Sequence, residues 1–205
     1  MKITNEMIDK ELRARGKVMN MIFKAENRES YIKLSKRFNK INKLSRKKPK
    51  DMILEKRWIS FRDGSKKICV NIYKLDNKKS NKVTGVLWLH GGGYSMGVPE
   101  QDENLYRELL KEEDCVIIAP EYTLSIEKPY PAALLDSYES LLWMKENAEE
   151  LGIRENQLMV GGESAGGGLT AALTLYARDK GEVKIAFQMP LYPMIDDRMI
   201  TESSK

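Results

Sequence analysis

The chain is poor in the residues that most often carry chemistry or cross-link a fold. Its 205 residues contain one histidine, His90, and two cysteines, Cys69 and Cys115. Both cysteines lie in apolar, strand-like segments, so we expect free buried thiols rather than a disulfide framework. One histidine and two distant cysteines offer no cluster of metal ligands, so no metal is predicted. The sequence implies no organic cofactor either.

Long apolar runs are also missing. No stretch of about 18 apolar residues occurs, so no membrane span is predicted. The first residues, MKITNEMIDKELRARGK, lack the apolar core of a secretory signal, and we therefore expect a cytoplasmic protein. Hydrophobic residues nevertheless make up 41% of the chain, which suffices for one sizeable core and argues against a largely disordered chain.

Charge is distributed unevenly along the chain. Residues 1–57 hold 18 Lys and Arg against 7 Asp and Glu, whereas the remainder holds 17 against 23. A basic arm of this kind suits nucleic acid or an anionic membrane surface. It has no interleaved arginine and aromatic residues and no nucleic-acid-binding motif. A solvated helical surface is therefore the favoured interpretation, and nucleic acid is not predicted as a partner.

Periodicity divides the chain into a basic helical arm, residues 1–48, and an alternating body, residues 49–205. The run RKKPK at 46–50 ends the arm, and a polar loop is expected at 76–82. The alternation of strands and helices predicts an α/β fold of three layers, with a mostly parallel sheet between helices. The expected helices are 3–26, 29–45, 100–113, 131–151 and 165–178, and the expected strands are 52–61, 67–75, 85–89, 115–119, 158–160 and 184–189.

The strongest local motif is Gly-Glu-Ser-Ala-Gly at residues 162–166. It fits G-x-S-x-G and stands between a predicted strand and a predicted helix. A serine in such a turn adopts strained backbone angles, and small flanking residues let the chain reverse without collisions. The turn lifts the hydroxyl of Ser164 to a helix N-terminus, where N–H groups favour developing negative charge. The alternative is a glycine-rich helix start that only packs close to the sheet.

A second motif, His-Gly-Gly-Gly-Tyr at residues 90–94, directly follows the predicted strand that ends at Leu89. Three glycines let backbone N–H groups turn toward one point, as an oxyanion hole requires. A phosphate-binding loop and an ordinary flexible turn are the alternatives, but neither G-x-x-x-x-G-K-[ST] nor G-x-G-x-x-G is present. The two motifs together, each after a strand, are far more specific than either alone.

These segments resemble the hormone-sensitive-lipase-like branch of the α/β-hydrolase fold, which contains carboxylesterases and lipases. The resemblance runs from about residue 50 to residue 198. It rests on HGGGY at 90–94, PEYTL at 120–124, PYPAALLD at 129–136, GGESAGGGL at 161–169 and PLYPMIDDR at 190–198.

The resemblance implies a site and a substrate class. Ser164 would be the acylating nucleophile that attacks a small ester substrate, and the N-terminal arm would contribute to a cap over the acyl pocket. The oxyanion hole would be formed by the N–H groups of Gly91, Gly92 and Ala165. Supporting roles would fall to His90, Gly93 and Glu163.

The sequence departs from the family in two respects. Thr123 stands where family members usually have arginine, and no histidine follows Ser164. The family's triad acid and histidine come after the nucleophile in the chain. His90 is therefore interpreted as part of the oxyanion loop, with a role as base as the alternative. Asp196 and Asp197 are interpreted as a structural pair, with a triad acid as the alternative.

We therefore expect a serine carboxylic ester hydrolase, C-terminally truncated, that is nearly inactive alone because the triad acid and histidine are absent. A separately encoded C-terminal fragment is a candidate partner. The last predicted strand, residues 184–189, would then be an exposed apolar edge. The alternative function is a non-catalytic protein that binds a small acyl or carboxylate ligand on a hydrolase scaffold.

Overall fold

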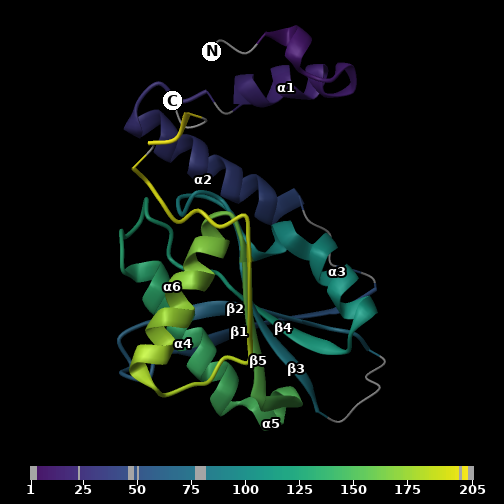
Figure 1. The fold of residues 1–205 in the computed structure, drawn as a ribbon, viewed down its shortest axis with the longest axis vertical. Coiled ribbons are helices and arrows are strands. Elements are labelled where there is room, and N and C mark those ends of the chain that lie inside the picture. Colours follow the sequence, from purple (N-terminus) through teal and green to yellow (C-terminus); the bar gives the residue numbers. More distant parts are fainter. Residues whose placement is uncertain are drawn as a thin grey trace.

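The computed structural model describes residues 4–22, 24–45, 49, 51–76, 82–198 and 200–202. Within these ranges the chain forms a helical arm and an α/β body (Figure 1). Most of the linker expected at 46–50 and of the loop expected at 76–82 lies outside the described residues. No helix in the described ranges is long and apolar enough to cross a membrane.

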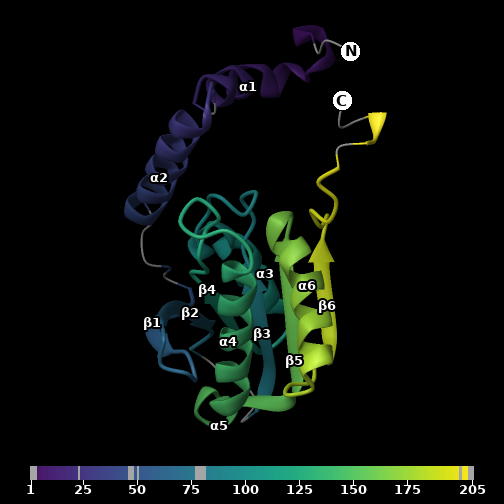
Figure 2. The ribbon, with the colours of Figure 1, turned by 90° about the vertical axis from the view of Figure 1, so that its left-hand side faces the viewer.

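The arm contains a short 3₁₀ turn, η1 (Asn5–Met7), and two helices, α1 (Lys10–Ile22) and α2 (Arg28–Ser45). The side chain of Asn27 explains where α2 begins, because its Oδ1 accepts the backbone N–H of Ser30 at 2.9 Å. Helix α2 runs across one end of the body, whereas α1 projects away from it (Figures 1 and 2). The single helix expected over 3–26 is therefore interrupted before Lys10.

Six strands form one sheet in the order β1-β2-β4-β3-β5-β6. The first two strands pair as an antiparallel hairpin, and β2 also pairs antiparallel with β4. The other neighbours, β4, β3, β5 and β6, pair in parallel. The mostly parallel α/β sheet predicted from the sequence is thus confirmed. The strands are β1 (Ile53–Ser60), β2 (Lys67–Lys74), β3 (Val83–Leu89), β4 (Cys115–Pro120), β5 (Ile153–Glu163) and β6 (Phe187–Leu191).

Helices cover both faces of the sheet and produce two cores. Helices α4 and α6 lie on one face and α3 on the other (Figures 1 and 2). Strand β3 serves both cores, because Leu87 packs on the α4–α6 side and Trp88 on the α3 side. Each such fully buried side chain contributes about 1.5–3 kcal/mol. The helical elements of the body are η2 (Pro99–Asp102), α3 (Glu103–Glu112), α4 (Ala132–Glu146), α5 (Ala148–Leu151) and α6 (Ala165–Lys180).

Element ends agree with the sequence where a glycine takes a left-handed conformation. Gly152 ends α5 at φ +66°, and Gly181 ends α6 at φ +70°. The strand expected over 158–160 is much longer in the structure, where β5 continues through two glycines that the sequence suggests as its end. A Cβ on Gly161 would lie 2.7 Å from the Trp88 ring. That glycine permits close packing within the strand rather than ending it. The last strand begins at Phe187, three residues later than expected.

The departure at Thr123 is compensated elsewhere in the chain. Asp136 is buried, with 2% of its side chain exposed, and both of its oxygens lie 2.7 Å from Lys66 Nζ. The backbone N–H of Thr123 also donates to Asp136, and its hydroxyl contacts Lys66. Lys66, from the turn before β2, therefore supplies the positive charge that this buried carboxylate requires.

Two expectations about the sheet edge and the cysteines can be compared with the structure. Strand β6 forms one edge of the sheet, and 59% of Phe187 on that strand is exposed. Cys69 and Cys115 are both buried and unpaired, as the sequence predicts.

Candidate active site

Ser164 occupies the sharp turn between β5 and α6. Its backbone angles are φ +54° and ψ −115°, a strained conformation that costs on the order of 1–3 kcal/mol for a residue other than glycine. Backbone hydrogen bonds hold it: its N–H donates to Leu191 O at 3.0 Å, and its carbonyl accepts from Met194 N at 2.8 Å. Ser164 is only partly buried, so the strained turn keeps this residue at the surface of the body.

The glycines of the elbow (residues 162–166) are required by close approach. A Cβ on Gly162 would lie 2.5 Å from Gly166 O, and one on Gly166 would lie 1.9 Å from Leu89 O. The first turn of α6 therefore packs directly against the end of β3. Ala165 opens α6 and is fully buried, and its N–H is one of the helix's free N-terminal donors.

The glycine loop (residues 90–97) lies beside the elbow because β3 and β5 are neighbours, with Leu89 paired to Gly162. A Cβ on Gly91 would lie 3.1 Å from both the backbone oxygen and Oε1 of Glu163. The loop itself is tightly folded: Gly92 has φ +128°, and a Cβ there would lie 2.0 Å from Met96 O. Gly93 follows with φ +59°. The loop is therefore a fixed turn, not an open one.

Both motifs follow the carboxyl ends of strands at the point where the chain changes direction across the sheet. From β3 the chain passes to β4 on one side, and from β4 it crosses to β5 on the other. In open α/β sheets, ligands bind at such a switch point. The serine and the glycine loop therefore meet where the topology favours a site.

His90 is built into the glycine loop. Only 2% of it is exposed, and its Nδ1–H donates to Gly91 O at 2.8 Å. Its ring stacks on Tyr122 at 4.2 Å, and the Tyr122 hydroxyl donates to His90 O at 2.7 Å. Burial lowers the pKa of His90 to about 4, so the ring is neutral near pH 7. With these contacts His90 supports the shape of the loop.

Glu163 belongs to an acidic pair that the sequence did not reveal. Tyr192 OH donates to Glu163 Oε2 at 2.5 Å, and Asp102 is hydrogen-bonded to Glu163. Trp88 Nε1–H donates to Asp102 Oδ2 at 2.9 Å. Burial, followed by the negative charge of Glu163, raises the pKa of Asp102 to about 7. In the sequence Asp102 stands at a helix start, where an acidic residue is ordinary, so no pattern singled it out.

Asp196 and Asp197 lie in the segment that follows β6. Arg198 Nε donates to Asp196 Oδ1 at 2.8 Å, and this contact lowers the pKa of Asp196. Both aspartates are exposed. Asp196 is thus engaged with its neighbour in the chain.

A cavity of about 350 Å³ lies next to the glycine loop, between α4 and α6. We call it the α4–α6 cavity. Tyr94 on its wall donates its hydroxyl to Met194 O at 3.0 Å, which ties the loop to the segment after β6. A small acyl group fits a cavity of this size. The wall includes Gly93, Tyr94, Pro131, Leu134, Gly168 and Leu169.

Known proteins are similar to this chain in both sequence and fold. Residues 86–205 match the sequence model of a family described as alpha/beta hydrolase fold. An arylesterase of Saccharolobus solfataricus is 32% identical over 157 residues, which are 76% of this chain and 50% of that protein. Carboxylesterase NlhH of Mycobacterium tuberculosis is 34% identical over 143 residues, which are 70% of this chain and 44% of that protein. The chain thus spans about half the length of these curated relatives.

Solved structures of esterases are also similar to this chain in fold. A bacterial heroin esterase superposes with a TM-score of 0.80 at 31% identity, covering 98% of this chain and 63% of that one. A structure described as an arylesterase superposes with a TM-score of 0.77 at 26% identity, covering 96% and 62%. The chain belongs to the α/β-hydrolase fold family.

Proposed function

We propose that Ser164 is the nucleophile of a carboxylic ester hydrolase. Its Oγ attacks the ester carbonyl carbon and its proton passes to a base, which then protonates the departing alcohol. Water then attacks the acyl-enzyme and releases the carboxylic acid. The proposal rests above all on the strained backbone of Ser164 at a strand-to-helix turn beside a fixed glycine loop.

The oxyanion that forms during both steps needs donors aimed at one point. We assign this role to the N–H groups of Gly91, Gly92 and Ala165. Preorganised donors of this kind are typically worth about 10²–10³ in turnover each. The tight fold of the loop and the packing of α6 against β3 favour such preorganisation, because neither element can relax without collisions. His90, Gly93 and Glu163 support this arrangement from behind.

The base is the missing part. The only histidine, His90, is buried and uses its Nδ1–H on its own loop. A serine without a base is a weak nucleophile, and loss of the triad histidine costs roughly 10⁶-fold in turnover. We therefore propose that these 205 residues alone hydrolyse esters very slowly. A separately encoded C-terminal segment that brings an acid and a histidine is the candidate partner.

Hydrolysis of p-nitrophenyl butyrate by the 205-residue chain and by its Ser164→Ala variant tests this proposal. We expect nearly equal rates, both close to the buffer rate. A wild-type rate well above the variant's would contradict the proposed slow hydrolysis, because the two proteins share the glycine loop and differ only in the Ser164 hydroxyl.

A second candidate function follows from the same gap in the site. A hydrolase scaffold without a base, but with the α4–α6 cavity, suits reversible binding of a small carboxylate. Calorimetric titration with butyrate decides between the two functions. Binding that Leu134→Trp abolishes would favour the binding protein, and absence of heat together with an unchanged melting temperature would exclude it.

A further inference from the structure

A second cavity, of about 380 Å³, lies between α2 and the antiparallel edge of the sheet. We call it the α2 cavity. Its wall on the arm includes Lys36 and Lys40, and its wall on the body includes Trp58 and Lys67. His90 and Gly97 of the glycine loop also reach it. None of the chemistry proposed for Ser164 uses this space.

The α2 cavity carries an excess of positive charge. Five lysines line it against two glutamates, Glu121 and Glu127, and the adjacent His90 is neutral. Two of the lysines have acidic partners: Lys43 pairs with Glu121, and Lys66 with Asp136. Within the described part of the chain, no carboxylate lies within ion-pair distance of Lys36, Lys40 or Lys67. Their charges are available to an incoming anion.

The spacing of these lysines is unfavourable without a ligand. Lys36 and Lys40 stand four residues apart and therefore lie on one face of α2, where like charges destabilise a helix. Lys43 continues the same face, one turn further on. A cluster that repels itself around a cavity is stabilised when an anion enters.

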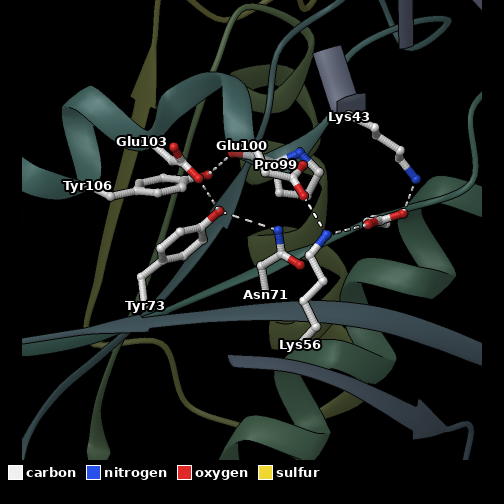
Figure 3. A network of polar contacts seen from close by, with 9 residues as sticks. Lys43, Lys56, Asn71, Tyr73, Pro99, Glu100, Glu103 and Tyr106 are labelled. Carbon is white, nitrogen blue, oxygen red and sulfur yellow. Dashed lines mark hydrogen bonds and ion pairs between the residues drawn. The ribbon is translucent and has the colours of Figure 1, made fainter. Parts of the chain in front are cut away.

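Polar contacts join α2 to the body beside this cavity, and Figure 3 shows the ion pairs among them. Lys43 of α2 binds Glu121, which also lies 3.5 Å from Lys56 Nζ, and Lys56 Nζ lies 2.5 Å from Glu100 Oε1. Further along α2, Asn39 Oδ1 accepts the backbone N–H of Gly97 at 2.8 Å. These contacts fix α2 to the body at two points, so a ligand meets a preformed site.

Apolar groups complete the lining. The Trp58 ring is 69% exposed although it reaches the cavity, and Ile68, Leu124 and Ile126 lie on the same wall. An exposed indole beside three free ammonium groups suits a ligand with an aromatic or aliphatic body and an anionic head. Lysine binds phosphate as a point charge, and no arginine in the lining offers the bidentate geometry of a carboxylate clamp.

We propose that the α2 cavity binds an organic phosphate monoester, with its dianionic head among Lys36, Lys40 and Lys67 and its apolar body against Trp58. The ligand would be either a free metabolite or the headgroup of a phosphate-bearing lipid. Because His90 and Gly97 of the glycine loop also line the cavity, the site lies outside the ester-hydrolysing machinery yet adjoins it.

Isothermal titration with phenyl phosphate tests the proposal, with benzyl alcohol as the neutral control. We expect Lys40→Glu/Lys67→Glu to weaken binding by about a hundredfold, about tenfold for each lost charge contact. The matched control is Lys17→Glu/Lys33→Glu, which changes net charge equally on residues outside the cavity and should stay within about twofold. Equal weakening by the two double variants, or no binding to the wild type, would overturn the site.

Two further experiments test the apolar subsite and distinguish the two sources of the ligand. Trp58→Ala should weaken phenyl phosphate but leave inorganic phosphate unchanged, and an equal loss for both would contradict the assigned apolar subsite. Sedimentation with vesicles of phosphatidic acid in phosphatidylcholine, compared with phosphatidylcholine alone, distinguishes the two sources. Binding to the acidic vesicles that the cavity variant loses and the control variant retains supports a lipid headgroup. Binding of phenyl phosphate without vesicle binding supports a free metabolite.

Discussion

At the scale of single residues, the site is governed by groups that have little freedom. Ser164 is held at a positive φ, and the glycines around it cannot be enlarged, since backbone oxygens of β3 and α6 occupy the space of a Cβ. Such strain persists only where the surroundings over-determine it. Serine therefore stands at a place where ordinary packing would select glycine, which argues for chemistry rather than for stability.

The acidic pair behind Ser164 makes stability depend on pH. The pKa of Asp102 rises from its ordinary value of 3.8 to about 7 in the folded protein. Between these values the folded state binds more protons than the unfolded state, so stability falls as pH rises from about 4 to about 7. We expect a loss on the order of 4 kcal/mol over this window, since the pKa rises by about three units and each unit is worth about 1.4 kcal/mol.

Asp102→Asn isolates this contribution. The amide can still donate to Glu163 and accept from Trp88 Nε1, but it does not titrate. Urea unfolding at several pH values should show that the wild type loses stability relative to the variant between pH 4 and pH 7. Parallel pH profiles for the two proteins would show that Asp102 has the same pKa in the folded and unfolded states, which would contradict the raised pKa.

The sequence could predict some of these residues and not others. Ser164 and the glycine loop stand in contiguous motifs, each after a strand, so the chain alone could single them out as candidates. Asp102 and Tyr192 meet Glu163 only after β3, β5 and β6 are aligned, from positions 61 and 29 residues away. No local pattern encodes such a meeting. Lys66 is a similar case, because its partner Asp136 lies 70 residues further on.

At the scale of elements, the ion pair of Lys66 joins the β1–β2 hairpin to α4. Replacing this lysine by methionine leaves the buried Asp136 carboxylate without its counter-charge. We expect Lys66→Met to destabilise the fold by about 2–3 kcal/mol in urea unfolding. Lys67→Met is the matched control, since the neighbouring lysine is exposed and has no acidic partner in the described structure; its cost should stay within about 0.5 kcal/mol.

A second substitution sharpens the test. In the Lys66→Met background, Thr123→Arg places a guanidinium on the residue whose N–H already reaches Asp136. Recovery of a large part of the lost stability is expected. If Lys66→Met lowers the free energy of unfolding no more than the control does, Lys66 does not stabilise the fold through Asp136.

Elements were predictable where apolar periodicity and end residues agreed. The continuous apolar run of β4 and the left-handed glycines after α5 and α6 left little ambiguity. Two boundaries failed for physical reasons. Strand β5 passes through Gly161 and Gly162, which accommodate Trp88 and α6 rather than a turn. The predicted helix 131–151 divides into α4 and α5 at Asn147, whose Nδ2 donates to Trp143 O at 2.8 Å.

At the scale of the whole molecule, the described residues bring Ser164 and the glycine loop together, and the proposed function assigns no base to Ser164 among them. Ser164 and the glycine loop lie at the switch point of the sheet, and α2 is fixed to the same loop through Asn39 and Gly97. The one histidine is buried and neutral. A small base supplied from solution should therefore substitute for the absent group, provided that Ser164 is a nucleophile in an otherwise formed site.

Imidazole-dependent hydrolysis of p-nitrophenyl butyrate is the most direct measurement of this claim. Imidazole attacks the ester by itself, so the Ser164→Ala variant supplies the background at every concentration. We predict that the wild-type rate rises above this background as imidazole increases and follows the neutral fraction of imidazole with pH. Identical rates for the wild type and Ser164→Ala across the titration would contradict the assignment of Ser164 as a nucleophile with a preformed oxyanion hole.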